Sequence, residues 1–118
     1  FVLHYIDLQK SRFEEGLQIV IHVPEKYFSK NIVPVTLQNL IENAIKHNII
    51  DDDLPLFISI HAANDYLIIV NNLQKKQFVE TSNKQGLAAL RHLYRYLTAD
   101  PLEVLETETE FIVKVPLL

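Results

Sequence analysis

Two spacings of apolar residues alternate along the chain and predict a domain of mixed helices and strands. Apolar residues at every second position, typical of half-buried strands, occur at 17–23, 56–60, 66–70, 102–104 and 111–115. Apolar residues at every third or fourth position, typical of helices, occur at 1–12, 34–48 and 86–97. In the last of these segments, one stripe is formed by Leu87, Leu90, Leu93, Tyr94 and Leu97. The order is therefore helix, strand, helix, two strands, helix, two strands.

The connections between these segments indicate the class of fold. The Asn64-Asp65 pair and residues 107–110 are short turns that predict two hairpins, whereas 71–85 is polar and predicts a long loop. Two hairpins favour a mixed, mostly antiparallel sheet. Three helices cover such a sheet most simply on one face, which gives an α+β fold built as a two-layer α/β sandwich.

Composition narrows the classes of function. The 118 residues are 48% hydrophobic and 22% charged, as expected for one globular domain, and no apolar run is long enough to cross a bilayer. The chain has no Cys, which excludes disulfides and a thiol nucleophile, and its net charge of −4 argues against a nucleic-acid partner. Only two glycines are present, which excludes the glycine-rich phosphate loops of the common nucleotide-binding motifs.

The segment 34–48 reads PVTLQNLIENAIKHN and carries the most informative pattern. At about 100° per residue, its leucines and isoleucines fall on one arc of a helix. The opposite arc is formed by Asn39, Glu42, Asn43 and Lys46.

This polar arc has two readings. A solvated helix face is the simpler one, but such a face favours strong helix formers, and Asn is a poor residue in the middle of a helix. Asn39 and Asn43, one turn apart and in line with Lys46, are better explained as ligands. Carboxamide oxygens can coordinate Mg²⁺, and an ammonium group can neutralise phosphate.

The same string resembles the N-box of the GHKL (Bergerat-fold) ATP-binding domains, and more narrowly that of LytS-type sensor histidine kinases. The resemblance extends along the chain, because Arg12-Phe13 matches a pair at the end of the family's dimerisation helix. It implies the end of that helix at 1–13 and a histidine kinase-like ATPase catalytic domain at 14–118.

The resemblance implies a role for each residue of the polar arc. Asn43 corresponds to the residue that coordinates Mg²⁺, and Asn39 to a position that faces the phosphates and that carries a catalytic Glu in the related hydrolases. Lys46 and His47 correspond to residues that line the phosphates, and Glu42 is a candidate acid, base or supporting partner. The residues expected to act in catalysis are therefore Glu42, Asn43 and Lys46.

The glycine boxes of the family are altered in this chain. In the first, Asn71 replaces the Asp that accepts a hydrogen bond from adenine, and Leu73 replaces a glycine that allows positive φ and close approach. The second is reduced to Lys84, Gly86 and Leu87, at the start of a helix whose N–H groups could face phosphate, with Ser82 as a further contact in the preceding loop.

The resemblance implies the catalytic domain of a two-component sensor histidine kinase that binds ATP and Mg²⁺ and transfers the γ-phosphoryl group to a histidine outside this sequence. It further implies a homodimeric full-length protein, a response regulator of the LytTR type, and a cytoplasmic position in a sensor anchored in the bacterial inner membrane. The alternative is a degenerate Bergerat domain that no longer binds ATP and acts through dimer or partner contacts, as Leu73 would favour. A third reading is an α/β sandwich whose polar stripe is fortuitous.

Overall fold

The computed structural model describes residues 8, 11–27, 29–32, 36–74 and 84–118. After a helical segment at 11–13, the elements are η1 (Glu14–Gly16), β1 (Leu17–His22), η2 (Glu25–Tyr27), α2 (Thr36–His47), β2 (Leu56–Ala63), β3 (Tyr66–Asn72), α3 (Lys84–Leu97), β4 (Glu103–Glu106) and β5 (Glu110–Pro116). From β1 onward this order confirms the one predicted from the hydrophobic spacing, whereas the helix predicted at 1–12 lies mostly outside the described residues.

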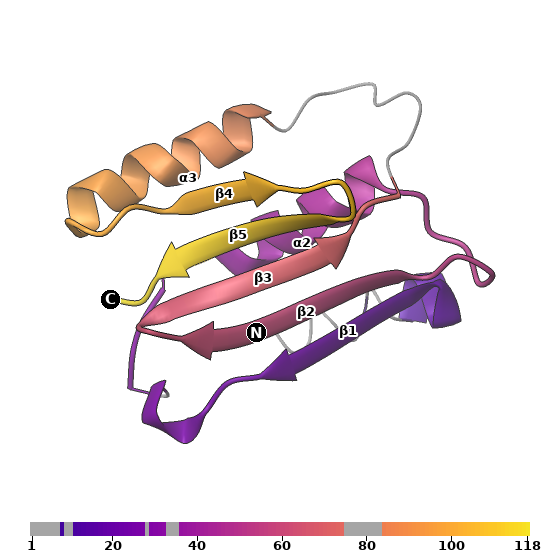
Figure 1. The fold of residues 1–118 in the computed structure, drawn as a ribbon, viewed down its shortest axis with the longest axis horizontal. Helices are drawn as coiled ribbons and strands as arrows, with labels where there is room; N and C mark the ends of the chain where they lie inside the picture. The colour runs from indigo at the N-terminus through magenta and orange to yellow at the C-terminus, as the bar shows by residue number, and fades with distance from the viewer. Residues whose placement is uncertain (1–7, 9–10, 28, 33–35, 75–83) are drawn as a thin grey trace.

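The five described strands form one mixed sheet in the order β1-β2-β3-β5-β4 (Figure 1). β1 pairs with β2 in parallel, with Leu17 opposite Leu56. All other neighbours are antiparallel, and β3 pairs with β2 on one side and with β5 on the other. The predicted mixed, mostly antiparallel sheet is therefore confirmed.

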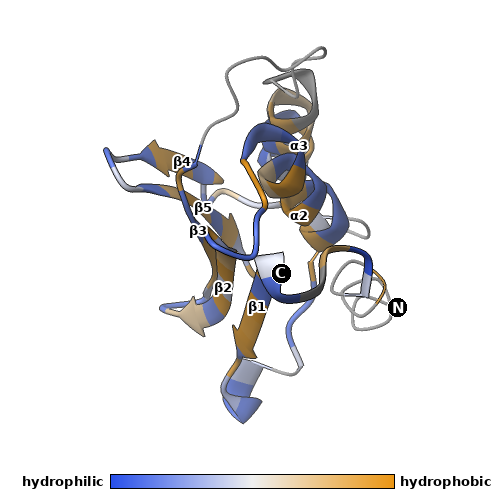
Figure 2. Cartoon of the chain, turned by 90° about the vertical axis from the view of Figure 1, so that its right-hand side faces the viewer, coloured by the Kyte–Doolittle hydropathy of each residue, from blue (hydrophilic) through white to orange (hydrophobic). Residues whose placement is uncertain are grey.

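The sheet buries one face beneath the helices (Figure 2). Along β2, the even-numbered residues from Leu56 to Ala62 are buried and the odd-numbered ones are exposed or half-buried, as period-two alternation requires. Buried residues of α2 and α3, including Ile41 and Leu90, complete the same core cluster. The described parts of the chain thus form the two-layer sandwich expected from the sequence, with α2 and α3 on one face.

The tight turn between β2 and β3 depends on two residues with positive φ. Asn64 has φ 53° and Asp65 has φ 64°. Two consecutive left-handed residues suit the right-handed twist of a two-residue hairpin, and Asn and Asp tolerate this conformation better than most side chains. The Asn64-Asp65 turn predicted from the sequence is therefore confirmed.

Gly16 is required by close packing rather than by its backbone angles, since no described glycine has positive φ. A Cβ built on Gly16 would lie 3.0 Å from Ile50 Cγ2 and 3.3 Å from the carbonyl carbon of Asp51. One of the two glycines of the chain thus lets the start of β1 approach the loop that follows α2.

A buried hydrogen bond joins the two helices that cover the sheet. Thr36 Oγ1, in the first turn of α2, lies 3.1 Å from the hydroxyl oxygen of Tyr94 on α3. Both residues have no exposed surface. Because buried hydroxyl groups are costly without partners, this pair helps to fix the position of α3 against α2.

The structure corrects three details of the sequence reading. β3 continues to Asn72, inside the predicted 71–85 loop, because Asn71 and Asn72 pair with β5. α3 begins at Lys84 instead of Gly86. Leu93 and Leu97, assigned to the buried stripe of α3, are 41% and 50% exposed, because the helix contacts the core mainly through Leu90 and Tyr94.

The hydroxyl group of Tyr94 provides a test of the contact between the helices. We expect Tyr94→Phe to lower the free energy of unfolding by about 1–2 kcal/mol, because a buried hydrogen bond is lost. The matched control is Tyr96→Phe on the same helix, whose side chain is 78% exposed, and it should change stability little. Urea denaturation measures both variants, and equal stabilities would contradict the role assigned to Tyr94.

Candidate functional site

Four parts of the chain lie at the same end of the sandwich (Figure 1). They are the C-terminal ends of α2 and β3, the N-terminal end of α3, and the turn between β4 and β5. Most of the residues singled out in the sequence lie on or beside these ends. The fold therefore brings together segments that are far apart in the sequence.

The polar arc of α2 lies on the flank of the helix that is turned away from its buried residues. Asn39 and Glu42 are exposed, whereas Asn43 and Lys46 are half-buried. At about 100° per residue, the four residues fall within an arc of about 100°, with Lys46 and Asn39 between Glu42 and Asn43. The structure thus keeps Glu42 on the same flank as the three residues with which it was grouped.

Asn48 and Gln74 connect the C-terminal end of α2 to the end of β3. Asn48 is buried, donates from Nδ2 to the carbonyl of Ala44 at 2.9 Å, and accepts from the backbone N–H of Gln74 at 2.8 Å. The N–H of Ile49 donates to the carbonyl of Gln74 at 2.7 Å. The Gln74 side chain donates back to the carbonyls of Ile49 and Leu54. We call these two residues the Asn48–Gln74 clamp.

The clamp is not evident from the sequence. The sequence pattern predicts Asn48 only as the end of a helix, and Gln74 as part of a polar loop. The available signal was Asn48 itself, since Asn directly after a helix commonly bonds to nearby backbone. Its partner lies 26 positions away in the chain and depends on the fold.

Asn71, the candidate adenine contact, is buried at the end of β3 on the side that faces the helices. Its Nδ2 donates to the carbonyl of Asn72 at 2.9 Å, which orients the carboxamide. Asn72 points to the other side of the sheet, and its Oδ1 accepts from the N–H of Phe57 at 2.7 Å. The two neighbouring asparagines therefore differ in role, and only Asn71 faces the helix layer.

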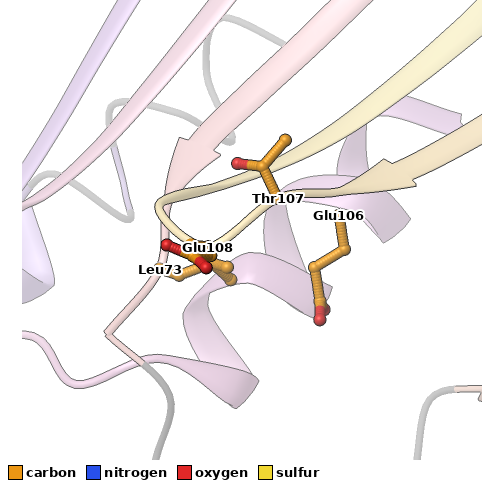
Figure 3. A pocket seen from close by; sticks show the side chains of 4 residues that line it. All are labelled: Leu73, Glu106, Thr107 and Glu108. Atoms are coloured by element: carbon orange, nitrogen blue, oxygen red, sulfur yellow. The ribbon is translucent and has the colours of Figure 1, made fainter.

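Leu73, which stands in place of a family glycine, has no positive φ. Its N–H donates to the carbonyl of Thr109 at 2.9 Å, so the backbone after β3 is held against the β4–β5 turn. A cavity of about 640 Å³ is lined by Leu73, Glu106, Thr107 and Glu108. Figure 3 shows Glu106 and Thr107 pointing to opposite sides of the strand end. The lining of the cavity includes the carboxylates of Glu106 and Glu108 and one apolar side chain, that of Leu73.

Five candidates remain. Four of them belong to α3 or to the sequence just before it, and the fifth, His47, lies on α2. Ser82 lies outside the described residues, and Lys84 and Gly86 are described only as backbone in the first turn of α3. Leu87 is half-buried and packs against the core, so it has a structural role besides the one expected. His47 is half-buried in the last turn of α2 and already has an interaction within the protein.

The donor set near α2 is suited to Mg²⁺ only in combination with a phosphate ligand. Among the described residues, no group of three or more His, Cys, Asp or Glu side chains could hold a metal ion. The half-buried carboxamide of Asn43 offers one oxygen, and Mg²⁺ is commonly bound by one or two protein ligands together with phosphates and water. The residues present therefore fit a magnesium ion that arrives with a nucleotide.

Sequence comparisons connect the chain to sensor kinases. No family model matches the chain. It is 31% identical over 90 residues to the sensor protein LytS of Enterococcus faecalis, a match that covers 75% of this chain and 14% of LytS. It is 40% identical over 43 residues to the sensor histidine kinase BtsS of Escherichia coli K12, which covers 36% of this chain and 8% of BtsS. The matches thus span only a small part of these relatives.

Solved structures identify the class of fold. The catalytic domain of the histidine kinase ThkA superposes with a TM-score of 0.58 at 14% identity, over 95% of this chain and 87% of that one. The Acinetobacter baumannii histidine kinase AdeS gives 0.54 at 14% identity, over 98% of this chain and 60% of that one. The fold is that of a histidine kinase catalytic domain. Within that class, the similarity to LytS confirms the resemblance to LytS-type kinases.

None of the helices in the described part of the chain is both long and apolar enough to span a membrane.

The clamp can be tested through stability. We expect Asn48→Ala to lower the free energy of unfolding by about 2 kcal/mol, because the N–H of Gln74 loses its partner in a part-buried position. The control is Asn39→Ala, an exposed position in the same helix, where the higher helix propensity of Ala should leave stability unchanged or slightly raised. Denaturant titrations of both variants would contradict the clamp if Asn48→Ala were as stable as its control.

Proposed function

We propose that this chain is the ATP-binding catalytic domain of a sensor histidine kinase, which binds Mg-ATP and donates the γ-phosphoryl group to a histidine outside this sequence. One observation carries the proposal. The flank of α2 with Asn39, Asn43 and Lys46 is attached by the Asn48–Gln74 clamp to the end of β3, where Asn71 faces the helix layer. This connection supports a site in which the flank of α2 binds the phosphates and the end of β3 binds the base.

In this proposal, the flank of α2 holds the phosphate end of the nucleotide. Asn43 offers a carboxamide oxygen to Mg²⁺, and Asn39, one turn earlier, hydrogen-bonds to phosphate oxygens or to water. Lys46 and His47 supply positive charge from the last turn of α2. The magnesium ion, when bound, would neutralise charge that develops on the transferred group.

The opposite end of the site suits the base. Asn71 uses Nδ2 in its bond to the carbonyl of Asn72, so its Oδ1 remains as the acceptor for an amino group such as that of adenine. The Glu106 and Glu108 carboxylates border the cavity beside Leu73 and would repel phosphate. This difference in charge favours a nucleotide with its phosphates toward Lys46 and its base toward Asn71.

Phosphoryl transfer depends mainly on positioning and on neutralisation of charge, so few groups need to react. Asn39 is a carboxamide where the related hydrolases carry a carboxylate base, and it cannot remove a proton from water. This residue favours transfer to a protein acceptor over hydrolysis. Glu42 is exposed and remains a candidate acid or base on the same flank. Lys84, Gly86, Leu87 and Ser82 are proposed as further nucleotide contacts beside the start of α3.

The wider setting is part of the same proposal. The phospho-acceptor histidine would lie on dimerisation helices that end at 1–13, in a homodimeric protein whose catalytic domain, at 14–118, faces the cytoplasm beneath the bacterial inner membrane. Its response regulator would be of the LytTR type. The similarity to LytS over 90 residues supports this setting.

A degenerate domain that no longer binds ATP is the competing function. Two observations favour it: Leu73 carries a bulky side chain where the family has glycine, and Asn71 brings no charge to the adenine position. The negative φ of Leu73 shows that the backbone here does not need glycine for its conformation. Direct binding measurements test whether the Leu73 side chain leaves room for adenine.

We expect the chain to bind Mg-ATP with a dissociation constant in the millimolar range or tighter, and ATP without Mg²⁺ more weakly. Asn43→Ala should weaken Mg-ATP binding about tenfold or more, because the proposed magnesium ligand is removed. The matched control is Asn31→Ala, an exposed asparagine between η2 and α2, which should bind like wild type. Calorimetric titration measures all four cases. Absence of detectable binding to the wild-type chain would support the degenerate domain instead.

A further inference from the structure

A groove lies between α3 and the sheet edge formed by β4, away from the flank of α2. It encloses about 410 Å³ and is lined by Leu87, Ala88, Arg91, His92, Arg95 and Val104. Leu87, Ala88 and Val104 give it an apolar floor, and the other three side chains give it a basic wall. Leu87 and Val104 also pack against the core, but neither the core nor the proposed kinase chemistry accounts for the basic side chains beside them.

The basic wall is unusual for this chain, whose net charge is −4. Arg91 and Arg95 are one helical turn apart, so their guanidinium groups lie on the same flank of α3. Both are exposed, and in the described part of the chain neither forms an ion pair with a carboxylate. His92 is exposed beside them, with its ring against that of Tyr96 at 5.3 Å. The wall therefore offers free positive charge next to apolar surface.

The other side of the groove is a sheet edge. In the described sheet, β4 pairs with β5 alone, so half of its backbone N–H and C=O groups point away from the sheet. β4 contains no Pro, and its two charged residues, Glu103 and Glu106, lie at its ends. A helix beside a free strand edge is the arrangement in which an extended peptide can add a strand to the sheet.

We propose that the groove between α3 and β4 binds an extended acidic segment of a partner protein, which adds to β4 as a sixth strand. Backbone hydrogen bonds to the β4 edge align the segment. Alternate side chains then point toward the groove, where their carboxylates meet Arg91 and Arg95 and their aliphatic parts cover Val104. A small free anion would use the arginines but neither the apolar floor nor the strand edge.

The charge of the surroundings limits the choice of partner. Glu103 and Glu106 are exposed at the two ends of β4, so a polyanion long enough to pass the groove, such as a nucleic acid, would meet carboxylates. A short segment in which acidic and neutral residues alternate can instead direct its carboxylates to Arg91 and Arg95. Leu87 is shared with the proposed nucleotide contacts, but neither arginine belongs to the flank of α2 or to the end of β3, so the Arg91 and Arg95 variants test the groove separately from ATP binding.

The test uses the full 118-residue chain and three fluorescent hexapeptides. One alternates Thr and Glu, the second has Lys in place of Glu, and the third is the Thr-Glu peptide with every second backbone nitrogen methylated. We expect fluorescence anisotropy at low salt to show binding of the first peptide at least about tenfold tighter than of the other two, since only it offers both acidic groups and a free strand edge.

Variants locate the binding site. Arg91→Glu and Arg95→Glu should each weaken binding of the Thr-Glu peptide about tenfold, through reversal of an exposed charge next to the groove. Lys30→Glu makes the same reversal at an exposed position outside the groove and should leave the affinity within about twofold at moderate salt. Exposed substitutions of this kind should not unfold the chain, which circular dichroism checks.

Three results would overturn the proposal. The first is absence of binding by the Thr-Glu peptide. The second is equal binding of the methylated peptide, which would exclude strand addition. The third is complete displacement of the peptide by millimolar inorganic phosphate, which would identify a simple anion site instead.

Discussion

The position of α2 relative to the end of β3 depends on one buried carboxamide. The side chain of Asn48 donates a hydrogen bond to the carbonyl of Ala44 in its own helix and accepts one from the N–H of Gln74 after β3. Buried polar groups of this kind are costly when their partners are lost, so the two segments are held at a fixed separation. Together with the core contacts of α2, this connection gives the polar flank of α2 and the inward-facing Asn71 a common geometry.

The hydrogen bond between Thr36 and Tyr94 acts at the other end of α2, where it ties the helix to α3. The two ends of α2 are thus fixed to different parts of the fold, one to the sheet and one to the neighbouring helix. Leu40, Ile41 and Ala44 fill the space between these points and are buried. Core contacts and two polar connections therefore set the position of α2. Because the residues of its outward flank are not needed for that position, they can serve ligand binding instead of stability.

The sequence was sufficient to predict the elements and their layers, because burial on one face produces the period-two and helical spacings directly. It was also sufficient to identify α2 as the informative helix, since asparagines such as Asn39 and Asn43 are unfavourable in a merely solvated face. The clamp could not be predicted, because the partner of Asn48 depends on tertiary structure. The width of the buried stripe on α3 was overestimated at Leu93 and Leu97, since periodicity shows which side of a helix is apolar but not how far the sheet extends beneath it.

The parallel pairing of β1 with β2 has a consequence for where such a site can arise. Neighbouring parallel strands must be joined by a chain that crosses one face of the sheet, and here that connection contains η2 and α2. The helix that bears the polar flank is therefore the crossover that the topology already requires. Substitutions on the outward side of such a helix change which ligands it can bind, while the residues on its inward side keep it packed on the sheet. Ligand binding can therefore be gained or lost without any change in topology.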